Sequence, residues 1–326
     1  MARRPKNPEP RKMIWLGIVL AILLGPLMVP VSTSGAVTHK EAAGPDGTFF
    51  KWQGIDIHYR LTSAQANCPA PSNLVVLIHG FGASTFSWLP VEDKFSPCDD
   101  VISYDRPAFG LTERKLSWDG LNPYSMAAQQ SILSDLVAKF ANGRPAILVG
   151  HSAGGQIAAK FALDNPQLVE KLVLEAPAIL NSTPGANLAW LTYIPQLNHL
   201  GPLLVSSIAS SGMEVLTQSY HDTSKLTDNT IAGYRVPLTI QNWEFAFWEF
   251  SRAERSTDVA SRLSEFKMPV LIVTGDDDRI VETALTRELA AKMPAAEFVV
   301  ISNSGHLPHE ETTEEFMAAV LPFVNG

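Results

Sequence analysis

Cysteine is scarce in this sequence, which has only Cys68 and Cys98 among its 326 residues. Two cysteines exclude a scaffold built on several disulfide bonds, although they allow a single bridge. Neither cysteine has a partner at the spacing of a metal site. The sequence therefore gives no sign of a structural metal, and we expect neither a metal nor a cofactor.

Basic residues are also few, with 25 Lys and Arg against 33 Asp and Glu and a formal net charge of -8. Binding to nucleic acid requires concentrated positive charge, so we expect no nucleic-acid partner. The sequence contains no internal repeat or low-complexity tract, which excludes a repeat architecture. A hydrophobic content of 46% instead indicates a globular protein with a sizeable core.

The N-terminus has a composition of its own. The first twelve residues are rich in Arg and Lys, residues 13–31 are largely apolar, and the small residues Ser34-Gly35-Ala36 follow. This layout is typical of an export signal, and the apolar stretch is also nearly long enough to span a bilayer. We therefore predict that residues 1–36 are either a cleaved signal or a retained anchor, and the only membrane contact. In the first case the protein would be periplasmic or secreted, and in the second it would be anchored with its main domain outside the cytoplasm.

The residues Gly150-His151-Ser152-Ala153-Gly154 form a G-x-S-x-G motif between an apolar run, 146–149, and a helical pattern, 156–163. A tight turn from strand to helix strains its middle residue and requires small neighbours two positions away, which the glycines provide. Such a turn exposes the Ser152 hydroxyl. The N-terminus of the helix favours negative charge beside it.

Short apolar runs alternate with helical patterns along most of the chain, which predicts a mostly parallel central sheet with helices on both faces, an α/β fold. A hairpin with its turn at Gln53-Gly54 precedes this array. The strands are predicted at 74–78, 101–104, 146–149, 172–175, 270–273 and 297–301, and further helices at 125–140, 283–292 and 311–324.

The two cysteines each stand a few residues before a predicted strand, Cys68 before 74–78 and Cys98 before 101–104. If these strands are parallel neighbours, both cysteines lie at the same end of the sheet, where they can pair. We expect a bridge, with two free thiols as the alternative.

Residues 178–266 break the α/β pattern, because strand signals vanish and aromatic residues accumulate. Trp243, Phe247 and Phe250 fall on one helical face. We predict a helical cap over the sheet, and an α/β core formed by residues 37–177 and 267–326. Packing of the cap on itself is the alternative explanation for most of these rings.

Candidate chemistry follows three of the predicted strands. His306 follows strand 297–301 and an aspartate of the run Asp276-Asp277-Asp278 follows strand 270–273, so both can meet Ser152 at the carboxyl edge of the sheet. A hydroxyl becomes a nucleophile when a histidine removes its proton and an acid orients that histidine. The loop His79-Gly80-Phe81-Gly82 places the N–H of Phe81 where, with that of Ala153, it can bind an oxyanion.

Another loop, Asp105-Arg106-Pro107-Ala108-Phe109-Gly110, also contains charged residues. An Asp and an Arg so placed more often tie a loop together than act on a substrate. We therefore predict a structural role for this loop.

The order Ser…Asp…His, the His-Gly loop, the G-x-S-x-G turn and the late insertion together resemble the α/β-hydrolase fold family. The resemblance covers about residues 50–323. It implies that the acid stands three residues after Gly275, which makes Asp278 the acid and Asp277 the alternative. The family's corresponding loop usually reads D-x-P-G-x-G, and this chain has Ala108 where that pattern has its first glycine.

The combined prediction is a serine hydrolase that cleaves a small apolar ester, thioester or lactone through an acyl-enzyme, with catalytic Ser152, Asp278 and His306. We expect His79, Trp243, Phe247 and Leu307 to line the substrate pocket. Carbon–carbon bond hydrolases of the family typically have Asn before the serine and Trp after the histidine, where this chain has His151 and Leu307. That activity, amide hydrolysis and a ligand-sensing role without turnover are the alternatives.

Overall fold

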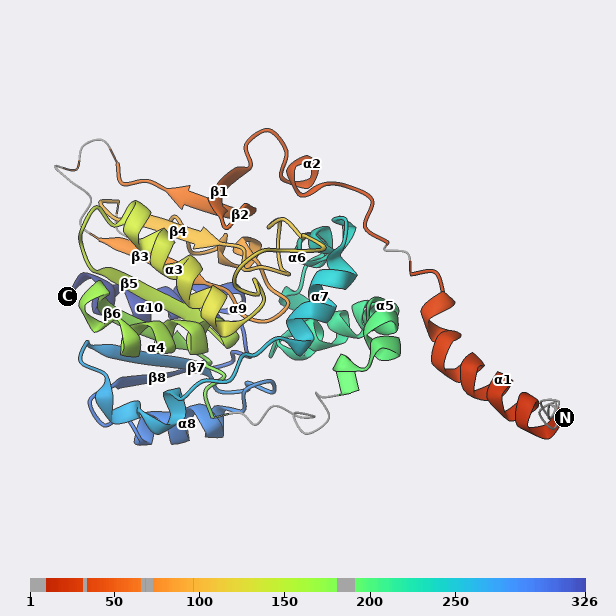
Figure 1. The fold of residues 1–326 in the computed structure, drawn as a ribbon. Coiled ribbons are helices and arrows are strands. Elements are labelled where there is room, and N and C mark those ends of the chain that lie inside the picture. The colour runs from red at the N-terminus through yellow and green to blue at the C-terminus, as the bar shows by residue number, and fades with distance from the viewer. Residues whose placement is uncertain (1–9, 32–33, 66–67, 69–72, 96, 181–190) are drawn as a thin grey trace, which may run out of the picture.

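The fold is built on one eight-stranded sheet, shown in Figure 1, in the order β1-β2-β4-β3-β5-β6-β7-β8. The computed structural model describes residues 10–31, 34–65, 68, 73–95, 97–180 and 191–326. β1 pairs with β2, and β2 with β4, in antiparallel fashion, and the remaining pairs are parallel. The strands are β1 Thr48–Trp52, β2 Ile55–Thr62, β3 Leu74–Ile78, β4 Asp100–Tyr104, β5 Ala146–His151, β6 Val169–Glu175, β7 Val270–Gly275 and β8 Glu297–Ile301.

Helices cover both faces of the sheet. Alternate residues of a strand point to opposite faces, so each buried strand contributes to two apolar clusters. Leu74, Val76 and Ile78 of β3 belong to the cluster that packs beneath α3 (Met126–Phe140), α4 (Ala153–Asp164) and α8 (Thr283–Ala291). Val75 and Leu77 pack with the opposite cluster, which α10 (Thr313–Asn325) covers. The predicted α/β class, with a mostly parallel sheet between helices, is confirmed.

Two predicted helices have different bounds. The helix expected at 311–324 is divided at Thr312 into α9 (Pro308–Glu311) and α10. Thr312 has φ -131° and ψ 54°, outside the helical region. The helix after the serine begins at Ala153 rather than Gln156, because Gly154 and Gly155 join it despite their poor helix propensity.

The segment between β6 and β7 contains α5 (Pro195–Gln218), α6 (Asp228–Arg235) and α7 (Trp243–Arg252), joined by short 3-10 turns. In Figure 1 these three helices gather beside one edge of the α/β core. The described part of residues 178–266 contains no strand. Residues 181–190, which include the aromatic Trp190, lie outside the described residues. We call residues 191–266 the cap.

The N-terminal region comprises α1 (Pro10–Leu24), a turn at Pro26–Met28 and α2 (His39–Ala43). Figure 1 shows α1 extending away from the rest of the molecule. Its apolar side chains are largely exposed, Trp15 to 67% and Ile22 to 65%. Every helix within the described ranges is too short or too polar to cross a bilayer.

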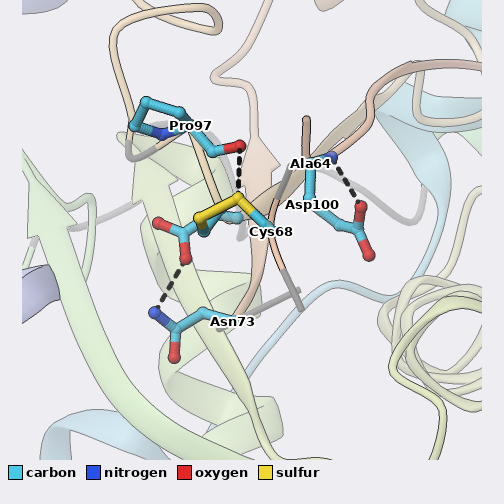
Figure 2. Close-up of a disulfide and its surroundings, with 7 residues drawn as sticks. Ala64, Cys68, Asn73, Pro97 and Asp100 are labelled. Carbon is cyan, nitrogen blue, oxygen red and sulfur yellow. Dashed lines mark hydrogen bonds between the residues drawn. A yellow bond between two sulfur atoms is a disulfide. The ribbon is translucent and has the colours of Figure 1, made fainter. Parts of the chain in front are cut away.

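Cys68 and Cys98 form a disulfide bond, with their Cα atoms 5.6 Å apart. Figure 2 shows the bridge at the amino ends of β3 and β4, which pair in parallel. Nearby, the side chain of Asn73 donates to Asp99 at 2.9 Å. The bridge follows from the parallel pairing of the two strands, as the sequence suggested.

The loop after β4 depends on the carboxylate of Asp105, which is buried. The carboxylate accepts hydrogen bonds from the backbone N–H groups of Thr85 and Leu111, both at 2.6 Å, and contacts Nδ1 of His58 at 2.8 Å. Burial by itself raises the pKa of Asp105, but the contacts with His58 and Leu111 outweigh it and lower the pKa to about 2. The side chain of Arg106 donates to the carbonyl of Gly80 at 2.8 Å. The prediction that this loop is structural agrees with these contacts.

Ala108, which stands where the family usually has glycine, adopts the left-handed region with φ 78°. A side chain with a Cβ is strained there by about 1 kcal/mol. We expect Ala108→Gly to be at least as stable as the parent in urea unfolding, because relief of this strain offsets the added freedom of the unfolded chain. In contrast, Ala138→Gly on the exposed side of α3 is expected to cost about 1 kcal/mol. Equal losses in the two variants would show that Ala108 is not strained.

Candidate active site

Ser152 occupies a strained turn between β5 and α4, with φ 52° and ψ -116°. The turn is possible because Gly150 and Gly154 have no side chains. A Cβ on Gly154 would lie 2.1 Å from the carbonyl oxygen of Ile78, and one on Gly150 would lie 2.6 Å from that of Gly154. The N–H of Ser152 donates to the carbonyl of Glu175 at 2.9 Å, which fixes the turn to β6.

His306 and Asp278 are in direct contact at the carboxyl ends of β8 and β7. Nδ1 of His306 lies 2.8 Å from Oδ2 of Asp278. The other oxygen of Asp278 accepts from the N–H groups of Ile280 and Val281, both at 2.9 Å. Both side chains are buried. A carboxylate held in this way can fix the orientation of the imidazole ring.

Asp277, the alternative acid, points elsewhere. Its carboxylate contacts Nδ1 of His221 at 2.8 Å and pairs with Arg279. Its side chain is 32% exposed, whereas that of Asp278 is fully buried. The geometry therefore selects Asp278 as the partner of His306.

Ser152 and His306 line one cavity of about 230 Å³ between the sheet edge and the cap. The core contributes Phe81, His151, Ile280 and Leu307, and the cap contributes Leu216, Tyr234, Trp243 and Phe247, among others. Most of these side chains are apolar. The cap also contacts the histidine loop directly, since the N–H of His306 donates to the carbonyl of Ser219 at 2.7 Å.

Two backbone N–H groups beside the serine are available to a ligand. Phe81 lies in the turn after β3, and Ala153 is the first residue of α4, so its N–H has no acceptor within the helix. Within the described part of the chain, neither N–H donates to a protein acceptor. The dipole of α4 adds positive potential at the same place.

Three of the four residues expected in the substrate pocket line the cavity. Trp243, Phe247 and Leu307 line the cavity, and His79 does not. Structural contacts occupy the fully buried ring of His79: Nδ1 lies 2.8 Å from the carbonyl of Gly80, and Nε2 accepts from the N–H of Arg106 at 3.0 Å. Burial, together with the charge of Arg106, lowers the pKa of His79 to about 3, so the ring is neutral.

His151, directly before the serine, supports the histidine loop. Its Nε2 donates to the carbonyl of His306 at 2.9 Å. Burial, followed by the neighbouring His306 and His309, holds the pKa of His151 well below its ordinary value. His151 therefore adds no charge to the cavity wall next to the serine.

Two contributions to the cavity were not predicted from the sequence, namely those of α5 and of Tyr234. Val205, Met213 and Leu216 of α5 line the cavity, and their spacing of eight and three residues marks one helical face. That spacing was the available signal. Tyr234 also lines the cavity, and its hydroxyl donates to the buried carboxylate of Glu310.

One cluster among the described residues has the composition of a metal site, namely His39, Asp56 and Glu113. Asp56 is already paired with Lys51 at 2.7 Å and Lys40 at 3.1 Å. The two ammonium groups neutralise its carboxylate, so the cluster is better explained as an ion-pair network. It lies among β2 and its neighbours rather than in the cavity.

The fold and the site define an α/β hydrolase. Residues 73–313 match the alpha/beta hydrolase fold family, so the chain belongs to it. An uncharacterized hydrolase of Bacillus subtilis, YugF, is 28% identical over 278 residues, covering 84% of this chain and 96% of the relative. A 2-hydroxy-6-oxononadienedioate/2-hydroxy-6-oxononatrienedioate hydrolase of Paraburkholderia phymatum is 28% identical over 304 residues, covering 88% and 98%. The chain is a hydrolase like these relatives.

Solved structures show the same fold. A hydrolase from Pseudomonas aeruginosa superposes with a TM-score of 0.69 at 20% identity, covering 86% of this chain and 99% of that one. An enol-lactonase from Burkholderia xenovorans superposes with a TM-score of 0.66 at 18% identity, covering 86% and 100%. At these identities the likeness concerns the fold alone.

Proposed function

We propose that this hydrolase cleaves small, uncharged apolar esters, including thioesters and lactones, with Ser152 as nucleophile. The observation that supports this most strongly is the contact between His306 and Asp278 at 2.8 Å beside a cavity that Ser152 also lines. A serine, a histidine and a buried acid at one sheet edge are the groups that acyl transfer requires.

In the proposed mechanism, His306 takes the proton of Ser152 as its oxygen attacks the substrate carbonyl. Asp278 holds the imidazole in the required tautomer and stabilises its positive charge. The N–H groups of Phe81 and Ala153 stabilise the negative charge on the carbonyl oxygen. His306 then protonates the leaving alcohol, and water attacks the acyl-enzyme by the same route in reverse, releasing the acid and restoring Ser152.

The walls of the cavity support an uncharged substrate. None of the described residues that line it is Lys or Arg, and the low pKa of His151 keeps that ring neutral. A carboxylate buried here would lack a cationic partner, which costs several kcal/mol. The aromatic and aliphatic cap residues favour an apolar acyl group instead.

Hydrolysis of a carbon–carbon bond is the second candidate, because several relatives are named as hydrolases of 2-hydroxy-6-oxo-dienoate compounds, in which a carbon–carbon bond is the one open to hydrolysis. The relative from P. phymatum is named for a dicarboxylate, whereas this cavity has no Lys or Arg among its described lining residues. The residues around the nucleophile and the base also differ from the pattern expected of such enzymes, with His151 and Leu307. Ester cleavage is therefore our first proposal.

A screen of substrates tests the proposed activity. We expect hydrolysis of p-nitrophenyl esters of graded acyl length, and stoichiometric labelling by a fluorophosphonate that peptide mapping locates at Ser152. His306→Ala should abolish both. A 2-hydroxy-6-oxo-dienoate and an anilide complete the panel. Faster turnover of the dienoate than of every ester would contradict the proposal in favour of carbon–carbon cleavage, and labelling without turnover would indicate a ligand sensor.

Trp243 provides a prediction for selectivity, since its ring forms part of the cavity wall. We expect Trp243→Phe to raise kcat/KM for long acyl esters about tenfold relative to the acetyl ester, because the smaller ring leaves room for additional methylene groups. Trp118→Phe is the matched control, since Trp118 packs on Tyr124 away from the cavity. An equal change for all chain lengths would mean that the variant alters stability rather than the pocket.

We also propose that the N-terminal segment carries the protein out of the cytoplasm. The basic start followed by residues 13–31 supports this. Fractionation of cells that express the full chain tests it, and activity confined to the cytoplasmic fraction would contradict it.

A further inference from the structure

Residues 34–37, which we call the strap, lie in extended conformation along the cap, although the cap is about 200 residues away in the sequence. The N–H groups of Ala36 and Val37 donate to the carbonyl of Thr239 at 2.8 and 3.1 Å, and the N–H of Gln241 donates back to Val37 at 2.8 Å. Val37 forms a parallel β-bridge with Ile240, which is buried. The strap thus lies directly before α7, the helix that supplies Trp243 and Phe247 to the cavity.

Ser34 makes three hydrogen bonds at the start of α7. Its N–H and its hydroxyl donate to Oε1 of Glu244 at 2.6 and 2.5 Å. Its oxygen accepts from the indole N–H of Trp243 at 3.0 Å. Ser34 therefore holds the ring that forms one wall of the cavity.

Glu244 depends on this contact. The side chain is 2% exposed, and among the described residues every hydrogen bond to its carboxylate comes from Ser34. Removal of Ser34 would leave a buried carboxylate without a hydrogen-bond donor, which is strongly destabilising.

Gly35 shows how tightly the strap is seated. A Cβ at this position would lie 2.0 Å from the carbonyl oxygen of Ile240 and 2.8 Å from the N–H nitrogen of Gln241. Only glycine fits between the strap and the cap. The small residues of Ser34-Gly35-Ala36 thus have a structural explanation that is independent of signal cleavage.

We propose that Ser34 is a positioning residue for the substrate cavity, and that Ser34, Gly35 and Ala36 are retained in the mature protein instead of being removed by cleavage after Ala36. The cavity role rests on the proposed function, whereas retention of the strap does not. A chain beginning at Val37 would lack the groups that hold Trp243 and Glu244. The N-terminal segment thereby becomes part of the enzyme's specificity.

The first experiment is to express the full chain in an exporting bacterial host and measure the intact mass of the purified protein. We expect the mass to include Ser34-Gly35-Ala36. A mature protein that begins at Val37 would overturn the proposal. This measurement needs no substrate, so it stands even if the protein hydrolyses no ester.

Variants then test the positioning role in the full chain. We expect Ser34→Ala to lower the thermal midpoint by at least about 3 °C and to change the ratio of kcat/KM for octanoyl and acetyl esters at least about threefold. Ser34→Thr keeps the hydroxyl and is expected to restore the ratio. The exposed Ser261→Ala is the control and should change neither quantity. If Ser34→Ala behaves like Ser261→Ala, Ser34 does not position the wall.

A second pair of variants tests the seat of the strap. Gly35→Ala is expected to shift the midpoint and the ester ratio in the same direction as Ser34→Ala, because the strap must move away from Ile240. Gly17→Ala is the matched control, since a Cβ at Gly17 meets nothing within 4 Å. Equal behaviour of the two glycine variants would contradict a tightly seated strap.

Discussion

Asp278→Asn is expected to lower kcat for ester hydrolysis by about 10⁴-fold, with a much smaller effect on folding. The asparagine amide still accepts from the N–H groups of Ile280 and Val281 through its oxygen, but its NH₂ group then faces Nδ1 of His306. The imidazole is held in the wrong tautomer and cannot take the proton of Ser152. Steady-state kinetics with a p-nitrophenyl ester, together with a thermal unfolding curve, measures the two effects separately.

Asp277→Asn is the matched control, because Asp277 is the neighbouring aspartate and contacts His221 and Arg279 instead. We expect its kcat to stay close to that of the parent. A large loss in Asp277→Asn with little loss in Asp278→Asn would assign the acid to Asp277. Equal losses would mean that the whole loop after β7, rather than one carboxylate, determines the activity.

Asp105→Asn is expected to lower the free energy of unfolding by about 3 kcal/mol or more. The substitution leaves a buried amide NH₂ group facing the donors on Thr85, Leu111 or His58, and at least one of these loses its acceptor. Urea unfolding of the parent and the variant measures the loss. The control is Asp119→Asn on the exposed surface, which we expect to change stability by less than about 0.5 kcal/mol.

The carboxylate of Asp105 also leads us to expect that the free energy of unfolding depends on pH. Its contacts lower the pKa of Asp105 to about 2 in the folded protein, against an ordinary value of 3.8. A lowered pKa stabilises the folded state fully above the unfolded value, and this contribution of about 2 kcal/mol is lost as the pH falls from about 4 to about 2. The unfolding free energy of Asp105→Asn should therefore fall less steeply than that of the parent over this interval. Parallel curves would show that Asp105 is not the group that titrates.

The α/β core could be predicted well from the sequence because its central strands, such as β3, β5 and β7, are buried along their whole length. Strand 74–78 has the predicted bounds, and the two residues of the predicted turn, Gln53 and Gly54, both adopt positive φ. The residues that gather at the sheet edge, Ser152, Asp278 and His306, were also predictable, since each follows a parallel strand. Local pattern and global fold agree at these positions.

The cap and its cavity were harder to predict, because their geometry depends on contacts between distant segments. The aromatic side chains of α7 were identified, but the wall formed by Met213 and Leu216 of α5 was not. The ring of His79, which we expected in the cavity wall, lies in the core, where it contacts Gly80 and Arg106. The break between α9 and α10 at Thr312 was not predicted, because no glycine or proline stands at that position. Composition indicates that a cap exists, whereas tertiary packing decides which of its residues face the cavity.

The position of the disulfide has a practical consequence. Cys68 and Cys98 lie at the amino ends of β3 and β4, whereas the serine and the histidine lie at the carboxyl ends of their strands. A reducing agent therefore acts at the end of the sheet opposite to Ser152 and His306. Unfolding measured with and without a thiol reagent would therefore report how much the disulfide stabilises that end of the sheet. The reactivity of Ser152 would not enter the comparison.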